Sequence, residues 1–457
     1  MKHKVLLICN YFAPDHTIGA VRTSKLAKYL KDSGYEIEVL TEKKKGEEDE
    51  LLKNDVKGIP IYYTENSKRF IRMHTFYEKL IQPYKKKRFD NLDNRKRVNR
   101  KTGNVEFYPF ETAYPIVGSL DYIIGQLKQI DLFRNAKRLL RKKQKFDFII
   151  TSYGDSFAYF AGKYYCKHHK DTTWIFDIRD SIYRYKFIPD YVSLIPKRYE
   201  QYIWKHADCI TGVSKGICKR VSPKFRHKVC CLTNGFDQID RKGLKRNRMD
   251  TYKMIFTYTG SMYGGLCDLS VFFYVMKDLI LNEQIDEKRI EFHFAGNESA
   301  FQIFKNQAAQ YQLAEQCISH GKLSRHDAME LQQRSDMLLV ASYDYQNCKG
   351  GVITGKALEY MGARRPVIAV ITGDIKHSEL ADIVRKTNIG IAYEDTHRSK
   401  DYVILYDYVR LQYQKFLETN ETEYKPNETE ICKYDYENLT KRLVKIMIQA
   451  ERRHGKR

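Results

Sequence analysis

Short apolar runs that alternate with helical patterns are the feature that most constrains how this chain can fold. The first apolar run spans 5–9 and is followed by a loop, a helical pattern over 20–31 and a second apolar run over 37–40. A strand, a loop, a helix and a strand in this order form a right-handed βαβ unit, and such units build a parallel sheet. The sequence therefore predicts an α/β fold.

The alternation continues along most of the chain in two series. In the first series, further strands are predicted at 146–151, 173–177, 208–213 and 229–233, and helices at 156–168 and 199–206. In the second series, strands are predicted at 255–259, 290–295, 316–320, 337–341 and 367–371, with helices between them. Two such series predict two doubly wound, Rossmann-like domains that face each other across a cleft.

Length and composition set the expected domain boundaries. A chain of 457 residues is longer than one hydrophobic core usually serves. Because residues 238–250 are polar, basic and without an apolar period, they are interpreted as a linker. We expect an N-terminal domain over 1–237 with a basic insert at about 43–145, a linker over 238–253, a C-terminal domain over 254–430, and a helix with a basic tail over 431–457.

The net charge of +23 indicates an anionic partner, which could be nucleic acid, an anionic membrane surface or a phosphorylated substrate. Two basic runs, at 85–88 and 95–101, and a basic stretch over 134–145 lie in the insert, and a solvated face or a disordered loop is the alternative interpretation. No apolar run is long enough for a transmembrane helix. The ten cysteines lack zinc-ligand spacing, which indicates reduced thiols in a cytoplasm and no structural metal.

The segment 350–369 predicts a phosphate-binding site. It consists of a glycine-rich loop, a short helix that begins near Lys356, and a buried strand. A helix N-terminus with exposed N–H groups attracts anions, and Lys356 adds a full positive charge. Glu359 lies one turn later and could accept hydrogen bonds from the two hydroxyls of a ribose. The alternative is a charged helical turn in front of a core strand.

Several motifs together resemble the family-4 (group 1) glycosyltransferases of bacterial surface polysaccharide biosynthesis, which have the GT-B fold. The sequence 354–360, TGKALEY, is similar to the Pro-Ser-Lys-x-x-Glu-Tyr motif of that family's donor site. Weaker likenesses are Asn10 to Pro14 with Gly19, the run 207–214 and the turn 234–237. The resemblance implies a nucleotide-sugar donor, linked to UDP or GDP, transfer with retention of configuration, and no required metal.

The resemblance and the strand ends together give the candidate site. The predicted catalytic residues are Lys356, Asp177 and Asp180. The predicted donor-binding residues are Gly19, Gly260, Ser261, His320, Gly321, Gly355, Lys356 and Glu359. His16, Arg22 and Arg179 are predicted on the acceptor side. The loop 260–266 lacks the arginine and lysine that many relatives carry there, so Lys356, Lys349 or Arg22 would have to meet the phosphate charge.

Two of these assignments have structural alternatives. Asp177, Arg179 and Asp180 could form an ion pair that only supports the fold, and His320 could be a strand-end residue satisfied by a neighbour. Competing functions are a GT-B nucleotide-sugar epimerase and a non-catalytic protein that binds membrane or nucleic acid. The leading hypothesis is a transferase acting on a lipid-linked or polysaccharide acceptor, in the cytoplasm or peripherally at the inner face of the cell membrane, with nucleic acid not expected as a partner.

Overall fold

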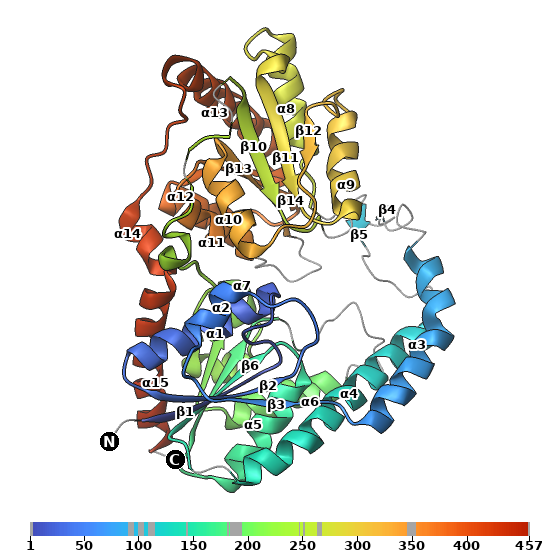
Figure 1. Cartoon of the computed structure of the whole chain (residues 1–457), viewed down its shortest axis with the longest axis vertical. Coiled ribbons are helices and arrows are strands. Elements are labelled where there is room, and N and C mark those ends of the chain that lie inside the picture. Colours follow the sequence, from blue (N-terminus) through green and yellow to red (C-terminus); the bar gives the residue numbers. More distant parts are fainter. Residues whose placement is uncertain are drawn as a thin grey trace. The chain divides into compact units, whose positions relative to one another are not determined.

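The computed structural model describes residues 3–89, 96–98, 105–107, 115–142, 145–180, 182, 194–245, 247–249, 252–262, 267–344 and 353–455. The chain divides into two compact units. The first unit consists of Met1–Val213, Ile217–Cys231 and Leu443–Arg457, and the second consists of Ser214–Gly216 and Leu232–Arg442. Each unit contains its own parallel sheet with helices packed against it, as Figure 1 shows.

Seven parallel strands form the sheet of the first unit, in the order β3-β2-β1-β6-β7-β8-β9. Val5 of the central strand β1 lies opposite Ile37 of β2 on one side and Phe148 of β6 on the other. All residues of β1 after Lys4 are buried, because helices cover both faces of a parallel sheet. The strands are β1 (Lys4–Cys9), β2 (Glu36–Glu42), β3 (Ile61–Thr64), β6 (Phe148–Tyr153), β7 (Thr173–Ile178), β8 (Cys209–Gly212) and β9 (Val229–Cys231).

The helices of the first unit follow the predicted crossover pattern. The segment after β8 forms α7 (Lys215–Lys219), which contains residues of both units, and η2 (Pro223–Lys228) follows it. The other helices are α1 (Ile18–Asp32), α2 (Glu50–Asp55), α3 (Lys68–Phe89), α4 (Pro115–Lys142), α5 (Ser156–His168) and α6 (Leu194–His206).

The insert predicted at about 43–145 contains structure that the sequence pattern does not reveal. Its strand β3 pairs in parallel with β2, with Ile61 opposite Val39, so the insert extends the main sheet by one edge strand. It also contributes α3, α4 and the short antiparallel pair β4 (Lys96–Val98) and β5 (Val105–Phe107). The side chains of the basic runs at 85–88 and 95–101 lie outside the described residues.

Six parallel strands form the sheet of the second unit, in the order β12-β11-β10-β13-β14-β15. The edge strand β15 is not predicted from the sequence, because it is short and only partly apolar. The strands are β10 (Met254–Thr259), β11 (Ile290–Ala295), β12 (Cys317–Ser319), β13 (Met337–Asp344), β14 (Val367–Gly373) and β15 (Gly390–Glu394). The helices are α8 (Ser270–Leu281), α9 (Glu298–Ala309), α10 (Arg325–Arg334), α11 (Gly355–Ala363), α12 (Glu379–Thr387), α13 (Arg398–Thr419) and α14 (Glu428–Ile431), with the short 3-10 helices η3 (Gln238–Arg241), η5 (Glu287–Arg289), η7 (Asp395–His397) and η8 (Cys432–Tyr434).

The predicted linker over 238–253 is not an isolated connection in the structure. Its first residues form η3, and Arg241 is buried with only 2% of its surface exposed. The polar composition is misleading here, because this arginine finds its hydrogen-bond partners in distant parts of the second unit. The described residues of this stretch, 238–245, 247–249 and 252–253, thus belong to the second unit.

The C-terminal segment forms α15 (Tyr436–His454), which begins in the second unit and ends in the first. At its start, Phe236 and the helix exchange backbone hydrogen bonds, from Phe236 N to Tyr434 O at 3.0 Å and from Tyr436 N to Phe236 O at 2.9 Å. At its end, the ring of His454 contacts Asp208 Oδ2 at 3.1 Å and Lys170 O at 2.8 Å. Each end of the helix is therefore fastened to a different unit.

The start of α15 makes one glycine sterically necessary. A Cβ atom on Gly235 would collide with the carbonyl oxygen of Tyr434 and lie 2.6 Å from Leu439. We predict that Gly235→Ala lowers the free energy of unfolding by about 1–3 kcal/mol, because backbone must move to admit the methyl group. Thermal unfolding measures the change.

Gly125→Ala is the matched control for this substitution. Gly125 lies inside α4, and a Cβ atom there would meet none of the described atoms within 4 Å. Because alanine favours a helix over glycine, this control should leave the stability unchanged or raise it by up to about 1 kcal/mol. An equal loss in both variants would contradict the account of Gly235.

Candidate functional site

Three glycine turns meet at the carboxyl edge of the sheet in the second unit. Gly260 follows β10, Gly296 follows β11, and Gly321 lies two residues beyond β12. Gly260 N donates to Ala295 O at 2.6 Å, and Gly296 N donates to Gly321 O at 2.9 Å. A Cβ atom on Gly296 would lie 2.6 Å from Gly260 O, and Gly260 itself has a positive φ of 110°. Glycine is therefore required for these backbones to approach one another.

Lys356 lies in the first turn of α11, and its side chain crosses Gly260. A Cβ atom on Gly260 would collide with Lys356 Cε, so this glycine makes room for the lysine. The ammonium donates to Tyr258 Oη at 2.8 Å and to Ser261 O at 3.1 Å, and it lies 4.3 Å from the centre of the Tyr258 ring. The predicted donor-binding residues Gly260, Ser261 and Lys356 are thus in contact with one another.

Burial lowers the pKa of the Lys356 ammonium to about 8, although the charge of Glu359 and the Cys267 thiol act in the opposite direction. Burial takes water away from the charged form, and the neighbouring oxygens do not replace that water completely. A negatively charged group beside Lys356 would raise this pKa again.

The N-terminus of α11 has a second property of an anion site. Thr354 is the N-cap residue, but its hydroxyl makes no capping hydrogen bond within the part of the chain that the structure describes. A Cβ atom on Gly355 would meet no described atom within 4 Å. No described atom therefore crowds the predicted donor residue Gly355 beside the N–H groups of the first turn.

Glu359 is held one turn further along α11 by two residues that sequence reasoning missed. Gln332 Nε2 donates to Glu359 Oε1 at 2.9 Å, and Arg241 Nη2 lies 3.9 Å from the same oxygen. Arg241 also donates to the backbone oxygen of Glu359 at 3.0 Å and to Gln332 Oε1 at 2.6 Å. The carboxylate itself is 21% exposed, so it is fixed in place and still reachable by a hydroxyl.

This network continues to the end of β10. Gln332 Nε2 donates to Thr259 Oγ1 at 3.1 Å, and the hydroxyl of Tyr360 is 3.0 Å from both the backbone N and Oγ1 of Thr259. Gln332, Thr259 and Tyr360 are all buried. Because β10 also leads into Gly260, the network connects the carboxylate of Glu359 with the glycine turn. No local sequence signal identifies Arg241 or Gln332, since their partners are distant along the chain.

The ring of His320 has a hydrogen-bond partner in a neighbouring histidine, as the structural alternative predicts. Its Nε2 lies 3.0 Å from His293 Nδ1, and His293 Nε2 lies 3.0 Å from Glu291 Oε2. Burial first, and then the neighbouring His293, lowers the pKa of the His320 ring below its usual value. The backbone of His320 and Gly321 still forms part of the glycine edge, because His320 N donates to Phe294 O at 2.8 Å.

In the first unit, the structure favours the ion-pair interpretation of Asp177, with Arg22 rather than Arg179 as its partner. Arg22 donates from Nε and Nη2 to the two carboxylate oxygens at 3.0 and 2.8 Å. Ser152 and Thr211 hydroxyls donate to the same carboxylate at 3.0 and 2.7 Å. Burial alone would raise the pKa of Asp177, but Arg22, together with Thr211 and Arg179, outweighs it, and the pKa lies below its usual range.

The expected roles of Asp177 in catalysis and of Arg22 at the acceptor therefore lack support from the geometry. Both side chains are buried, with 4% or less of their surface exposed, and each satisfies the other. A carboxylate that already accepts four hydrogen bonds is a poor base for a substrate hydroxyl. The pair instead joins α1 to β7 inside the first unit.

The other predicted acceptor-side residues lie near the carboxyl edge of the first sheet. Arg179 Nη1 donates to the carbonyl oxygen of Gly19 at 2.6 Å, and Gly19 packs against the ring of Tyr11. Asp180 follows β7 and is exposed. His16 lies 3.1 Å from the backbone oxygen of Glu47. Gly19 and Arg179 are thus in contact, and Asp180 is the exposed carboxylate among the candidates on this edge.

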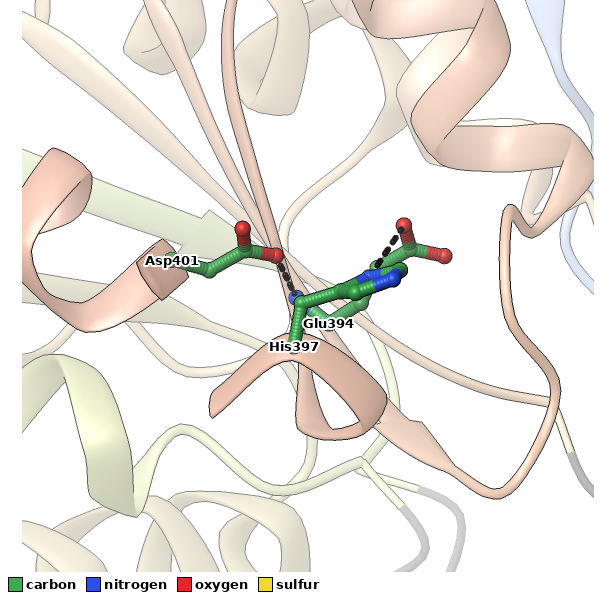
Figure 2. Close-up of side chains that lie close together, drawn as sticks. All are labelled: Glu394, His397 and Asp401. Carbon is green, nitrogen blue, oxygen red and sulfur yellow. Dashed lines mark hydrogen bonds and ion pairs between the residues drawn. The ribbon is translucent and has the colours of Figure 1, made fainter. Parts of the chain in front are cut away.

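Glu394, His397 and Asp401 form a cluster of metal-ligand types at the end of β15 (Figure 2). Glu394 Oε1 accepts from the backbone N of Ser378 at 2.7 Å, and Asp401 Oδ2 accepts from the backbone N of Glu394 at 3.0 Å. His397 Nδ1 lies 3.8 Å from Glu394 Oε2. Because both carboxylates bind the backbone at the ends of β15 and α12, we assign this cluster to local structure.

Residues 272–404 match the family described as glycosyl transferases group 1. No curated protein matches the chain in sequence. Among solved structures, sucrose-phosphate synthase from Thermosynechococcus elongatus is 10% identical, with a TM-score of 0.57 over 98% of this chain and 99% of that one.

Two further solved structures are similar over the whole chain. The UDP-forming trehalose-phosphate synthase from Burkholderia vietnamiensis is 11% identical, with a TM-score of 0.56 over 97% of this chain and 99% of that one. A lipopolysaccharide outer core galactosyltransferase is 12% identical, with a TM-score of 0.54 over the same shares. The second unit is thus a group 1 glycosyltransferase domain, and the chain has the GT-B fold.

Among the described helices, none combines the length and the apolar composition that crossing a bilayer requires.

The buried network around Arg241 generates a stability prediction. Arg241→Met keeps the length of the side chain but removes its hydrogen bonds to Glu359 O, Gln332 Oε1 and Met329 O. Breaking a buried charged network from one side typically costs about 3 kcal/mol. We expect a loss of that order in chemical unfolding of the second unit. The adjacent exposed residue supplies the control, since Lys242→Met should change the stability by less than about 0.5 kcal/mol.

Proposed function

We propose that this glycosyltransferase moves a sugar from a nucleotide-sugar donor to a lipid-linked or polysaccharide acceptor with retention of configuration. The observation that carries the proposal is the placement of Lys356 and Glu359 one turn apart on α11, beside the Gly260 turn. Lys356 suits a phosphate and Glu359 suits the two hydroxyls of a ribose. Both groups occur together in UDP- and GDP-sugars.

Lys356 would neutralise the diphosphate leaving group. The bond between the sugar and the diphosphate breaks with negative charge developing on the phosphate oxygens, and a fixed cation lowers the energy of that state. Tyr258 and Ser261 hold the ammonium in place, and the N–H groups at the start of α11 can add to its effect. These groups could meet the phosphate charge without a metal ion, so we propose that none is required.

Glu359 would accept hydrogen bonds from the ribose hydroxyls. Gln332 and Arg241 hold one of its oxygens and its backbone, which reduces the freedom that the side chain must lose on binding. The glycine edge formed by Gly260, Gly296 and Gly321 allows the nucleotide to approach the backbone closely. One solved structure of the same fold is that of a UDP-forming enzyme, so UDP is the first nucleotide to test.

On the acceptor side, Asp180 is the exposed candidate for orienting the attacking hydroxyl, with Arg179 and Gly19 beside it in the same edge. A lipid-linked or polysaccharide acceptor is proposed because the chain carries a net charge of +23, which favours an anionic membrane or a phosphorylated carrier. A structural neighbour that acts on lipopolysaccharide supports the same class of acceptor. We propose a cytoplasmic protein that binds peripherally to the inner face of the cell membrane.

Glu359→Ala tests the ribose assignment. Losing a charged acceptor for a hydroxyl pair costs roughly 1.5–3 kcal/mol, which predicts at least about tenfold weaker binding of the UDP-sugar. Isothermal titration calorimetry measures the affinity. Glu418→Ala, on the exposed face of α13, is the matched control and should bind as the unaltered protein does. Equal affinities in all three proteins would refute the assignment.

The depressed pKa of Lys356 gives a second test through pH. The ammonium loses its proton as the pH rises through about 8, so the affinity for UDP should fall. If binding needs the charged form, the loss between pH 7 and pH 9 is roughly tenfold. In Lys356→Arg the guanidinium stays charged, and its affinity should depend on pH only through the nucleotide itself. The same slope in both proteins would exclude Lys356 from the phosphate site.

Product analysis separates transfer from epimerisation. With a donor and no acceptor, the proposal predicts an unchanged nucleotide-sugar or its slow hydrolysis. Recovery of an epimerised sugar still attached to the nucleotide would establish the epimerase alternative instead.

A further inference from the structure

The helices α3 and α4 of the first unit form an antiparallel hairpin, as Figure 1 shows. Tyr77 Oη donates to Asp121 Oδ1 at 2.9 Å, and Ser67 N donates to Asp131 Oδ2 at 2.7 Å. The more buried residues of α3 lie on one face, which includes Tyr77 and the 6% exposed Ile81. The rest of the described part of α3 faces solvent.

Seven large apolar side chains in the described part of this hairpin are exposed, and Ile71 lies on the opposite side of α3 from the other six. Their exposed fractions range from 40% to 66%, which is far above that of a core residue. Exposed apolar residues are ordinary when scattered, but a group on one surface marks an interaction site. The other six are Met73, Phe76 and Leu80 on α3, and Leu120, Ile123 and Leu127 on α4.

Helical geometry brings the two apolar sets to the same side of the hairpin. An α-helix turns by about 100° per residue. On each helix, the exposed apolar side chains lie about 90–100° around the helix axis from the side chains that contact the other helix. Viewed from the N-terminus of each helix, this rotation has the same direction. Because the two helices are antiparallel, equal rotations point both sets in the same direction. The six side chains therefore form one surface, which we call the apolar ridge.

Positive charge borders this ridge. Arg69 and Arg72 of α3 are exposed, and the exposed line of α4 that starts with the three apolar residues continues with Arg134 and Arg138. Two carboxylates of α4 are engaged at the contact between the helices, where Asp121 binds Tyr77 and Asp131 binds Ser67. Glu78 pairs within α3, with its carboxylate 3.8 Å from His74. The ridge therefore combines apolar side chains with arginines and no carboxylate among the described residues that form it.

We propose that the apolar ridge docks this protein onto an anionic lipid bilayer. Apolar side chains enter the boundary of the acyl chains, while arginines bind lipid phosphates beside them. The net charge of +23 and the arginine border are complementary to such a surface. The sequence predicts the membrane contact in the basic insert, which includes the runs at 85–88 and 95–101 and the basic stretch 134–145. The ridge adds the insertion of apolar side chains, and its residues are described by the structure.

Docking is independent of the donor site. A protein that binds vesicles and transfers no sugar would keep this inference and refute the proposed function. A protein that transfers sugar to a soluble acceptor and ignores vesicles would do the reverse.

A tryptophan at the ridge tests insertion directly. Phe76→Trp should show a blue-shifted emission, quenched by bromolipids, when vesicles of phosphatidylcholine and phosphatidylglycerol are added to the full-length protein. Leu281→Trp is the matched control, because Leu281 is 69% exposed on α8 of the second unit, and its emission should not move. Unchanged emission from Phe76→Trp, or an equal shift in both variants, would overturn the proposal. A blue shift that needs no vesicles and grows with protein concentration would also overturn it, because it indicates docking of a second copy.

Charge reversal tests the arginine border. Each basic residue near an anionic surface contributes about 1 kcal/mol, or roughly a factor of five in affinity. Arg134→Glu with Arg138→Glu should therefore weaken vesicle binding by at least about twentyfold in co-sedimentation. Lys386→Glu with Lys400→Glu changes the net charge by the same amount at exposed positions of α12 and α13. An equal loss in both double variants would overturn the proposal, because general charge rather than the ridge would then explain binding.

Discussion

Parallel pairing of the strands is the constraint on which the rest of this structure depends. In both main sheets every described pairing is parallel, so each connection must cross the sheet and return to its starting edge. The carboxyl ends of all strands in a sheet therefore lie along one edge. In the second unit, this edge contains Gly260, Gly296, Gly321 and the start of α11. Consecutive members of this set are separated by more than thirty residues of sequence on average. Chemistry at this edge is a consequence of topology before any side chain is considered.

The sequence is informative where burial is continuous. Strands such as β1, β10 and β11 are buried along almost their whole length, and the predicted bounds match the observed ones to within one residue. The edge strands β3 and β15 are short and half-buried, so their sequences do not differ from those of loops. For Arg241, by contrast, the local sequence gives the wrong expectation. A charged residue in a polar segment indicates a linker, and only contacts with Gln332 and Glu359, about a hundred residues away, explain its burial.

The residues of the candidate site also differ in how well the local sequence predicts their roles. Lys356 and Glu359 could be selected from the sequence because a helix places them one turn apart, and the structure adds the direct contact of Lys356 with Gly260 and Ser261. The pair of Asp177 and Arg22 could not be predicted, since 155 residues separate its members. Burial and complete pairing remove Asp177 from the expected chemistry, whereas the same sequence stretch leaves Asp180 exposed. A charge at a strand end can thus be structural or functional, and the difference lies in partners that the local sequence does not contain.

The helix α15 has a consequence for how this protein is made. It starts beside Phe236 in the second unit and ends at Asp208 in the first, so the first unit is assembled from separated stretches of the chain. Domains commonly fold in order as they leave the ribosome. Here the first unit lacks part of its own structure until residues 443–454 have been synthesised, after the whole of the second unit. During translation the first unit therefore remains incomplete until its last segment has been synthesised.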